Sequence, residues 1–146
     1  MSKSLAVLVP ALLAAALPGC STLMPGTGAP DTPALRLEGT SWKILQINDV
    51  RLTADQARAT SASFSKGQAS FNAGCNRMGG GYKVNGSTIS FGQMISTLIG
   101  CPPPLAGFER EIGALLETPV EASMGNDGTL WLKGDRTRQL LLKSAD

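Results

Sequence analysis

The chain contains no histidine among its 146 residues. Histidine is the usual general base near neutral pH, a common metal ligand and the usual pH-sensitive switch. Its absence removes the residue on which most hydrolytic sites and many metal sites depend. The sequence therefore predicts a protein that is not an enzyme and that has neither a bound metal nor a cofactor.

A marked excess of charge of either sign is also missing. The chain has 13 basic and 11 acidic residues, giving a formal net charge of +2, and its lysines and arginines are scattered. Proteins that bind nucleic acid concentrate positive charge to neutralise phosphates. We therefore expect no nucleic-acid partner.

The amino-terminal apolar stretch is too short to cross a bilayer. Lys3 precedes an apolar run over residues 5–16, which Pro10 interrupts, whereas a membrane-spanning helix needs about 20 residues. This length is typical of the apolar region of a cleaved signal peptide. Residues 1–19 are therefore predicted to be a signal peptide, and loss of Lys3 with it would leave a net charge of +1.

The segment Leu17-Pro18-Gly19-Cys20 resembles the bacterial lipobox, in which a leucine stands three residues before the cysteine and a small residue just before it. The resemblance implies that the Cys20 thiol forms a thioether to diacylglycerol, and two acyl chains would hold the protein firmly on a membrane. An ordinary signal peptide with an unrelated cysteine is the alternative. Ser21, in place of an aspartate, favours the outer membrane facing the periplasm.

Residues 20–34 are rich in proline, glycine and threonine and are predicted to form a flexible tether. Residues 35–146 are left for one folded domain. Alternating apolar residues separated by turn signals predict short strands there, with hairpins at Lys66-Gly67 and Asn85-Gly86. A weak signal for a helical turn covers residues 53–58. Apolar residues at helical spacing between Pro104 and Pro119 predict one helix.

Cys75 and Cys101 are the cysteines that remain if Cys20 carries lipid. An even pair in an exported domain favours a disulfide, and two buried free thiols are the alternative. Catalysis by Cys75 would need a base or a lowered pKa, and Arg77 supplies only positive charge.

Segments spread over residues 37–143 resemble the META domain, the family of HslJ-like heat-shock lipoproteins. The matching stretches are residues 37–42, residues 74–78 followed by Gly80 and Tyr82, residues 95–102, and residues 131–132. Leu98 replaces the usual arginine of the family. The resemblance implies an α+β fold with a curved antiparallel β-sheet, or a small barrel-like sheet, and one packed helix. It implies a link to envelope stress, motility or secretion without a settled reaction.

The family motif points to six residues with a structural or binding role: Gly74, Asn76, Arg77, Gly80, Tyr82 and Glu109. Asn76 is expected to cap backbone groups, and Arg77 to pair with Glu109 or another acid. Glu109 and Glu111 are expected to be exposed helix charges. The run of residues 79–81 is expected to form a bulge or tight turn with positive φ, because it lacks the features of a phosphate-binding loop.

These observations predict a lipid-anchored, non-enzymatic envelope protein that contributes to stress tolerance by binding an envelope protein or a small ligand. Two other interpretations stay open. One is a periplasmic enzyme or enzyme inhibitor acting through a pocket in the sheet. The other is a carrier of a small apolar ligand in a barrel mouth, which would require an interior cavity.

Overall fold

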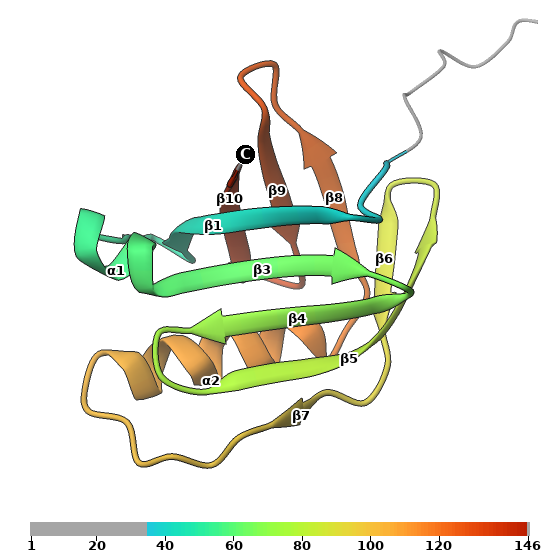
Figure 1. The fold of residues 1–146 in the computed structure, drawn as a ribbon. Coiled ribbons are helices and arrows are strands. Elements are labelled where there is room, and N and C mark those ends of the chain that lie inside the picture. The colour runs from blue at the N-terminus through green and yellow to red at the C-terminus, as the bar shows by residue number, and fades with distance from the viewer. Residues whose placement is uncertain (1–34, 146) are drawn as a thin grey trace, which may run out of the picture. The chain divides into compact units, whose positions relative to one another are not determined.

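The computed structural model describes residues 35–145. The predicted signal peptide (residues 1–19), the predicted tether (residues 20–34) and the proposed lipidation site Cys20 lie outside the described residues. Ten strands and two helices follow in the described part (Figure 1). The strands are β1 (Thr40–Ile47), β2 (Val50–Arg51), β3 (Thr60–Ser65), β4 (Gln68–Ala73), β5 (Arg77–Asn85), β6 (Thr88–Phe91), β7 (Ile95–Ser96), β8 (Val120–Met124), β9 (Thr129–Lys133) and β10 (Gln139–Ser144). The helices are α1 (Ala54–Ala59) and α2 (Leu105–Leu116).

Eight of the strands form a closed antiparallel barrel. Hydrogen-bonded neighbours run in the order β1, β3, β4, β5, β6, β8, β9, β10, and β10 pairs with β1 to close the ring. The closing register places Ile44 opposite Leu142 and Ile47 opposite Leu140, with an irregularity between Ile44 and Gln46. The short strand β2 pairs only with β1, and β7 only with β5.

The expected α+β class with a curved sheet is therefore wrong. The domain is a mostly-β closed barrel to which one 12-residue helix, α2, is added. Closure depends on pairing between the first and last long strands, which lie almost 100 residues apart. Local patterning gives the strands but not this long-range pairing, so the sequence did not distinguish an open sheet from a ring.

Side chains of the strands and of α2 fill the barrel interior. Buried and exposed residues alternate along strands such as β3 and β4, whereas β10 buries three leucines in a row. The inward-facing apolar side chains of the strands, and Leu37 just before β1, are almost fully buried. The largest of them are Phe64, Phe71, Leu37, Ile44, Ile89, Leu130, Leu132, Leu140 and Leu142. The helix adds Phe108, Ile112, Leu115 and Leu116 from one face, and it contacts β4 and β1. The prediction of one packed helix between Pro104 and Pro119 is confirmed.

The turns agree with the predicted hairpins, with one shift in register. Lys66 and Gly67 both have positive φ, as a type I′ turn requires, and connect β3 to β4. In the β5–β6 hairpin, Asn85 pairs with Thr88, so the two-residue loop is Gly86-Ser87 rather than the expected Asn85-Gly86. At the weakly predicted helical turn, α1 forms with Thr53 as its N-cap and a capping box completed by Gln56.

Glu38 connects the β3–β4 hairpin to β5. Its carboxylate accepts hydrogen bonds from the Lys66 amide, from the Gly67 amide at 3.3 Å and from the Tyr82 hydroxyl at 3.0 Å. These bonds, that of Lys66 first, lower the pKa of Glu38 below its usual value. Burial of the Tyr82 ring, and secondly its bond to Glu38, raises the pKa of Tyr82.

Replacement Glu38→Gln should flatten the acid side of the stability profile. A carboxylate whose pKa is lowered by folding stabilises the protein above its unfolded pKa of about 4.3, and the contribution disappears as pH falls through the folded pKa. The melting temperature, measured between about pH 6 and pH 3, should therefore fall less steeply in the variant. Glu117→Gln, on an exposed side chain, is the control. Equal slopes in wild type and Glu38→Gln would contradict the prediction.

Candidate functional site

The Asn76 side chain joins the start of β5 to the segment that leads into α2. It is only 3% exposed. Its amide nitrogen donates to the Ile99 carbonyl at 3.0 Å, to Cys101 Sγ at 3.2 Å and to Glu109 Oε2 at 2.7 Å. Its amide oxygen accepts from Thr97 Oγ1 at 2.8 Å and from the Ile99 amide at 2.9 Å. We call this set of residues, together with Ser96, the Asn76 network.

Cys75 and Cys101 form a disulfide directly beside this network, with a separation of 26 positions along the chain. The bond joins Cys75, the residue before Asn76, to Cys101, which lies four positions before the first residue of α2. Residues 95–101 are therefore attached to the start of β5 in two ways, by hydrogen bonds to Asn76 and by the disulfide. Shortly before the disulfide, Gly74 has a positive φ of 94°, and a Cβ added there would lie 3.1 Å from Leu105 Cδ2.

Glu109 points inward from α2 and not into solvent. One carboxylate oxygen accepts from Asn76, and the other accepts from Ser96 Oγ at 2.9 Å. Glu111 is also half-buried and accepts from the Asn48 amide nitrogen at 2.9 Å. The expectation that both acids are exposed helix charges is wrong, because each accepts a hydrogen bond from an asparagine in a distant part of the chain.

Arg77 does not pair with Glu109. Its side chain is exposed, and within residues 35–145 the salt bridges join Arg58 to Asp55 and Arg138 to Asp135. Only the Arg77 backbone takes part in the site: its amide donates to Thr97 Oγ1, and its carbonyl accepts from the Thr97 amide. The neutral amide of Asn76 takes the place next to Glu109 that we had expected the arginine to occupy.

Gly80 is required by a close approach of backbone and not by positive φ. Residues 79–81 lie within β5, and none of them has a positive φ. The expected bulge or tight turn is therefore wrong. A Cβ on Gly80 would lie 2.6 Å from the Gln93 carbonyl oxygen and 2.8 Å from Met94 Sδ. Only a glycine lets the segment after β6 cross so close to β5.

Substitution Gly80→Ala should lower the free energy of unfolding by about 1–3 kcal/mol, because the added methyl group must displace backbone. Gly79→Ala is the matched control on the same strand, since its Cβ would meet only the Ala69 carbonyl at an ordinary 3.6 Å. Urea unfolding of the two variants measures the difference. A Gly80→Ala protein as stable as Gly79→Ala would disprove the close approach.

A cleft of about 840 Å³ lies between α2 and the chain that follows β6. We call it the helix cleft. Its lining combines apolar and polar side chains, with small residues on the helix side. It is lined by Met78, Phe91, Gly92, Gln93, Met94, Ser96, Ala106, Glu109, Arg110, Gly113, Ala114, Leu116 and Glu117. Ser96 and Glu109 belong both to this lining and to the Asn76 network.

A second hollow, of about 1160 Å³, lies over the β5–β6 and β8–β9 hairpins. Its one carboxylate, Glu121, accepts hydrogen bonds from the hydroxyls of Ser87 and Thr88. None of the residues in the family motif lines it. The helix cleft is therefore the stronger candidate site.

The described chain brings no three or more His, Cys, Asp or Glu side chains together in a group that could hold a metal. Sequence reasoning identified Asn76, Glu109 and the two cysteines, but it missed Ser96, Thr97 and the cleft residues Met94 and Arg110. Ser96 and Thr97 lie in the segment over residues 95–102 that resembles the family, so that motif was the available signal. No pattern in the sequence pointed to Met94 or Arg110.

The fold and the site together define a small closed β-barrel whose single long helix is attached through a disulfide-bonded polar network. The chain belongs to the META domain family, whose model matches residues 35–146. An NMR structure of a protein from Burkholderia xenovorans is similar, with a TM-score of 0.61 and 21% identity over 80% of this chain and 97% of that one. A second NMR structure has a TM-score of 0.63 and 21% identity over 73% of this chain and 90% of the other. The comparison with curated proteins finds no match.

Proposed function

We propose that this protein is a lipid-anchored component of the bacterial cell envelope that contributes to stress tolerance without catalysing a reaction. In this proposal its META domain binds an envelope protein or a small ligand in the helix cleft. The cleft is the observation on which the proposal depends. Its volume is within the range of about 300–1,000 Å³ that ligand sites occupy, and its lining combines apolar side chains with polar groups.

The hydrogen bonding of the cleft supports binding in preference to catalysis. A catalytic carboxylate must point at the group from which it takes a proton. Both oxygens of Glu109 already accept hydrogen bonds, from Asn76 and from Ser96. The Ser96 hydroxyl donates to the Glu109 carboxylate. The chain has no histidine that could activate this hydroxyl as a nucleophile.

The amino-terminal sequence supports the location. Leu17-Pro18-Gly19-Cys20 and the short apolar run before it fit a signal that ends in a lipidated cysteine, and Ser21 favours the outer membrane facing the periplasm. Neither helix of the described residues is long and apolar enough to cross a bilayer. In this proposal attachment to the membrane comes from lipid on Cys20.

The interior of the barrel gives no support to a carrier of apolar ligands. Buried side chains such as Phe64, Phe71 and Leu132 occupy it together with the inner face of α2. A ligand would have to bind outside that core, as it would in the helix cleft. We therefore do not extend the proposal to a carrier.

The anchor is tested by the mass of the native amino terminus. Protein purified in detergent from the envelope should begin at Cys20 and carry diacylglycerol, and it should fractionate with the outer membrane. A Cys20→Ser protein should not be processed to the lipidated form. Native protein that begins at Met1, or that carries no fatty acid, would refute the anchor.

The cleft is tested by filling it. A Cβ on Gly113 would meet nothing within 4 Å, so Gly113→Trp can place its ring in the cleft without displacing backbone. Gly113→Ala is the control, and it should raise helix stability by about 0.5–1 kcal/mol. In a strain lacking the gene, Gly113→Ala should restore stress tolerance and Gly113→Trp should not, at equal protein levels. Full rescue by a stably folded Gly113→Trp protein would show that the cleft is not the site.

A further inference from the structure

Three large aliphatic side chains stand in solvent on the segment over residues 95–100, which we call the aliphatic loop. Leu98 is 94% exposed, Ile95 is 75% exposed and Ile99 is 63% exposed. No other described segment of this length exposes three large aliphatic side chains. Single exposed apolar residues are ordinary, whereas a cluster of them marks an interaction surface.

Several polar groups of the loop are hydrogen-bonded to the protein. The Thr97 hydroxyl and the Ile99 amide donate to Asn76, and the Ile99 carbonyl accepts from it. The Thr97 amide donates to the Arg77 carbonyl, and the Ser96 hydroxyl bonds Glu109. A polar group that enters hydrocarbon without a partner costs several kcal/mol, so these internal bonds lower the cost of moving the loop into an apolar phase.

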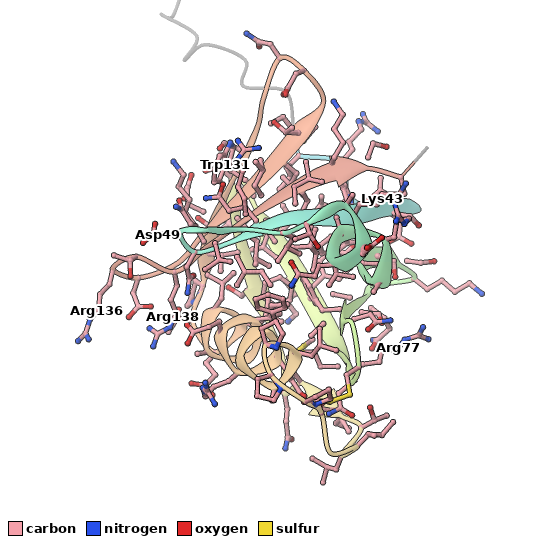
Figure 2. All side chains as sticks on the ribbon, turned by 90° about the vertical axis from the view of Figure 1, so that its left-hand side faces the viewer. Lys43, Asp49, Arg77, Trp131, Arg136 and Arg138 are labelled. Carbon is pink, nitrogen blue, oxygen red and sulfur yellow. A yellow bond between two sulfur atoms is a disulfide. The ribbon has the colours of Figure 1, made fainter. Side chains whose placement is uncertain are left out.

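The charges around the loop are also suited to a membrane surface. The sequence has no charged residue between Lys83 and Glu109, and the carboxylate of Glu109 is taken up by Asn76 and Ser96. Two exposed cations lie beside it: Arg77, whose backbone bonds Thr97, and Arg110, which lines the helix cleft together with Ser96. Figure 2 shows Arg77 projecting beside the disulfide that holds the loop. Cations next to an uncharged apolar surface are complementary to anionic lipid headgroups.

We propose that the aliphatic loop is a second membrane-contact site, which inserts Ile95, Leu98 and Ile99 into the interface of an anionic phospholipid bilayer while Arg77 and Arg110 lie at the headgroups. The contact is made by the protein itself and does not depend on lipid at Cys20. Because Ser96 lies both in the loop and in the lining of the helix cleft, insertion would hold that cleft beside the membrane surface.

The test uses residues 21–146, which lack the lipidation site. This part should fold alone, because the core extends from Leu37 to Leu142 and the match covers 97% of the similar Burkholderia xenovorans chain. Co-sedimentation with phosphatidylcholine vesicles containing phosphatidylglycerol should show binding that falls as phosphatidylglycerol is removed or salt is added. Leu98→Ser and Ile99→Ser should each weaken the binding about tenfold, and Arg77→Gln about fivefold.

Met124→Ser is the matched control, because Met124 is an exposed apolar residue (52%) at the end of β8. Figure 1 shows the β8–β9 hairpin at the end of the barrel opposite to β7. This variant should bind vesicles as the wild type does. Binding that is absent in the wild type, or that falls equally in Met124→Ser and Leu98→Ser, would overturn the proposal. So would preserved binding in Leu98→Ser and Ile99→Ser.

A second measurement uses the full chain in vesicles with brominated lipids. Fluorescence of Leu98→Trp should be quenched well beyond that of wild type, and Met124→Trp should not. Equal quenching of the two variants would place the loop outside the bilayer. The co-sedimentation test uses residues 21–146, which lack the anchor. An absence of lipid on Cys20 would therefore refute the proposed function and leave the co-sedimentation result unaffected.

Discussion

Replacing Asn76 with aspartate is expected to lower the free energy of unfolding by about 3–5 kcal/mol at neutral pH. The substitution removes the amide donor that bonds the Ile99 carbonyl, Cys101 and Glu109. It also places a second carboxylate at the 2.7 Å contact with Glu109, in a position that is 3% exposed. Two carboxylates so close in a buried site cannot both remain ionised at low cost.

The loss should depend on pH in a defined direction. The pair of carboxylates in the variant has a raised folded pKa, so the destabilisation is complete at neutral pH and shrinks as pH falls through that value. Urea unfolding at pH 7 and at pH 4.5 measures the difference between variant and wild type at each pH. Asn76→Ala is the control, because it loses the same donors without adding charge, and its deficit should shrink less between the two pH values. A deficit of Asn76→Asp that does not shrink at pH 4.5 would show that the contact with Glu109 is not close in solution.

Removing the disulfide with Cys75→Ala and Cys101→Ala together should cost about 3.5 kcal/mol, from the chain entropy of a loop of 26 positions. For a domain of this size the melting temperature should fall by about 15 °C. The measurement is thermal unfolding of residues 21–146, so that Cys20 does not take part in thiol exchange. Wild type in reductant should melt close to the double variant.

The reductant also provides the control for this prediction, because it should leave the melting temperature of the double variant unchanged. A wild-type protein whose melting temperature does not respond to reductant, although its thiols become available to alkylation, would contradict the prediction. The aliphatic loop should then be examined by hydrogen exchange. Its amides should lose protection before those of the barrel strands. Without the disulfide, the hydrogen bonds of the Asn76 network would be the remaining attachment of the loop to the start of β5.

The elements that follow from neighbouring residues were predicted best. The helix between Pro104 and Pro119 follows from apolar residues at helical spacing, and the hairpin at Lys66-Gly67 from a turn whose residues accept positive φ. The turn after β5 was displaced by one residue. There the pairing of Asn85 with Thr88 decides which two residues form the loop, and that pairing depends on the register of the whole hairpin.

The site was predicted only in part, because its residues come from separate segments. Asn76 and Glu109 were identified from the family motif, but the motif does not say that the two meet. We expected Arg77 to pair with Glu109, since opposite charges are the simplest partners. In the structure Arg77, the first residue of β5, has an exposed side chain, whereas Asn76, just before the strand, is buried and bonds Glu109.

The sequence by itself determined the family and the positions of most strands and of α2, because each of these depends on patterns among residues that are close along the chain. Only the tertiary structure decided that the sheet closes through β1 and β10, that Gly80 faces the Gln93 carbonyl, and that Asn76 bonds Glu109. These contacts join residues from 13 to about 100 positions apart. They form only when the whole barrel is assembled, and no local pattern of apolar and polar residues specifies them.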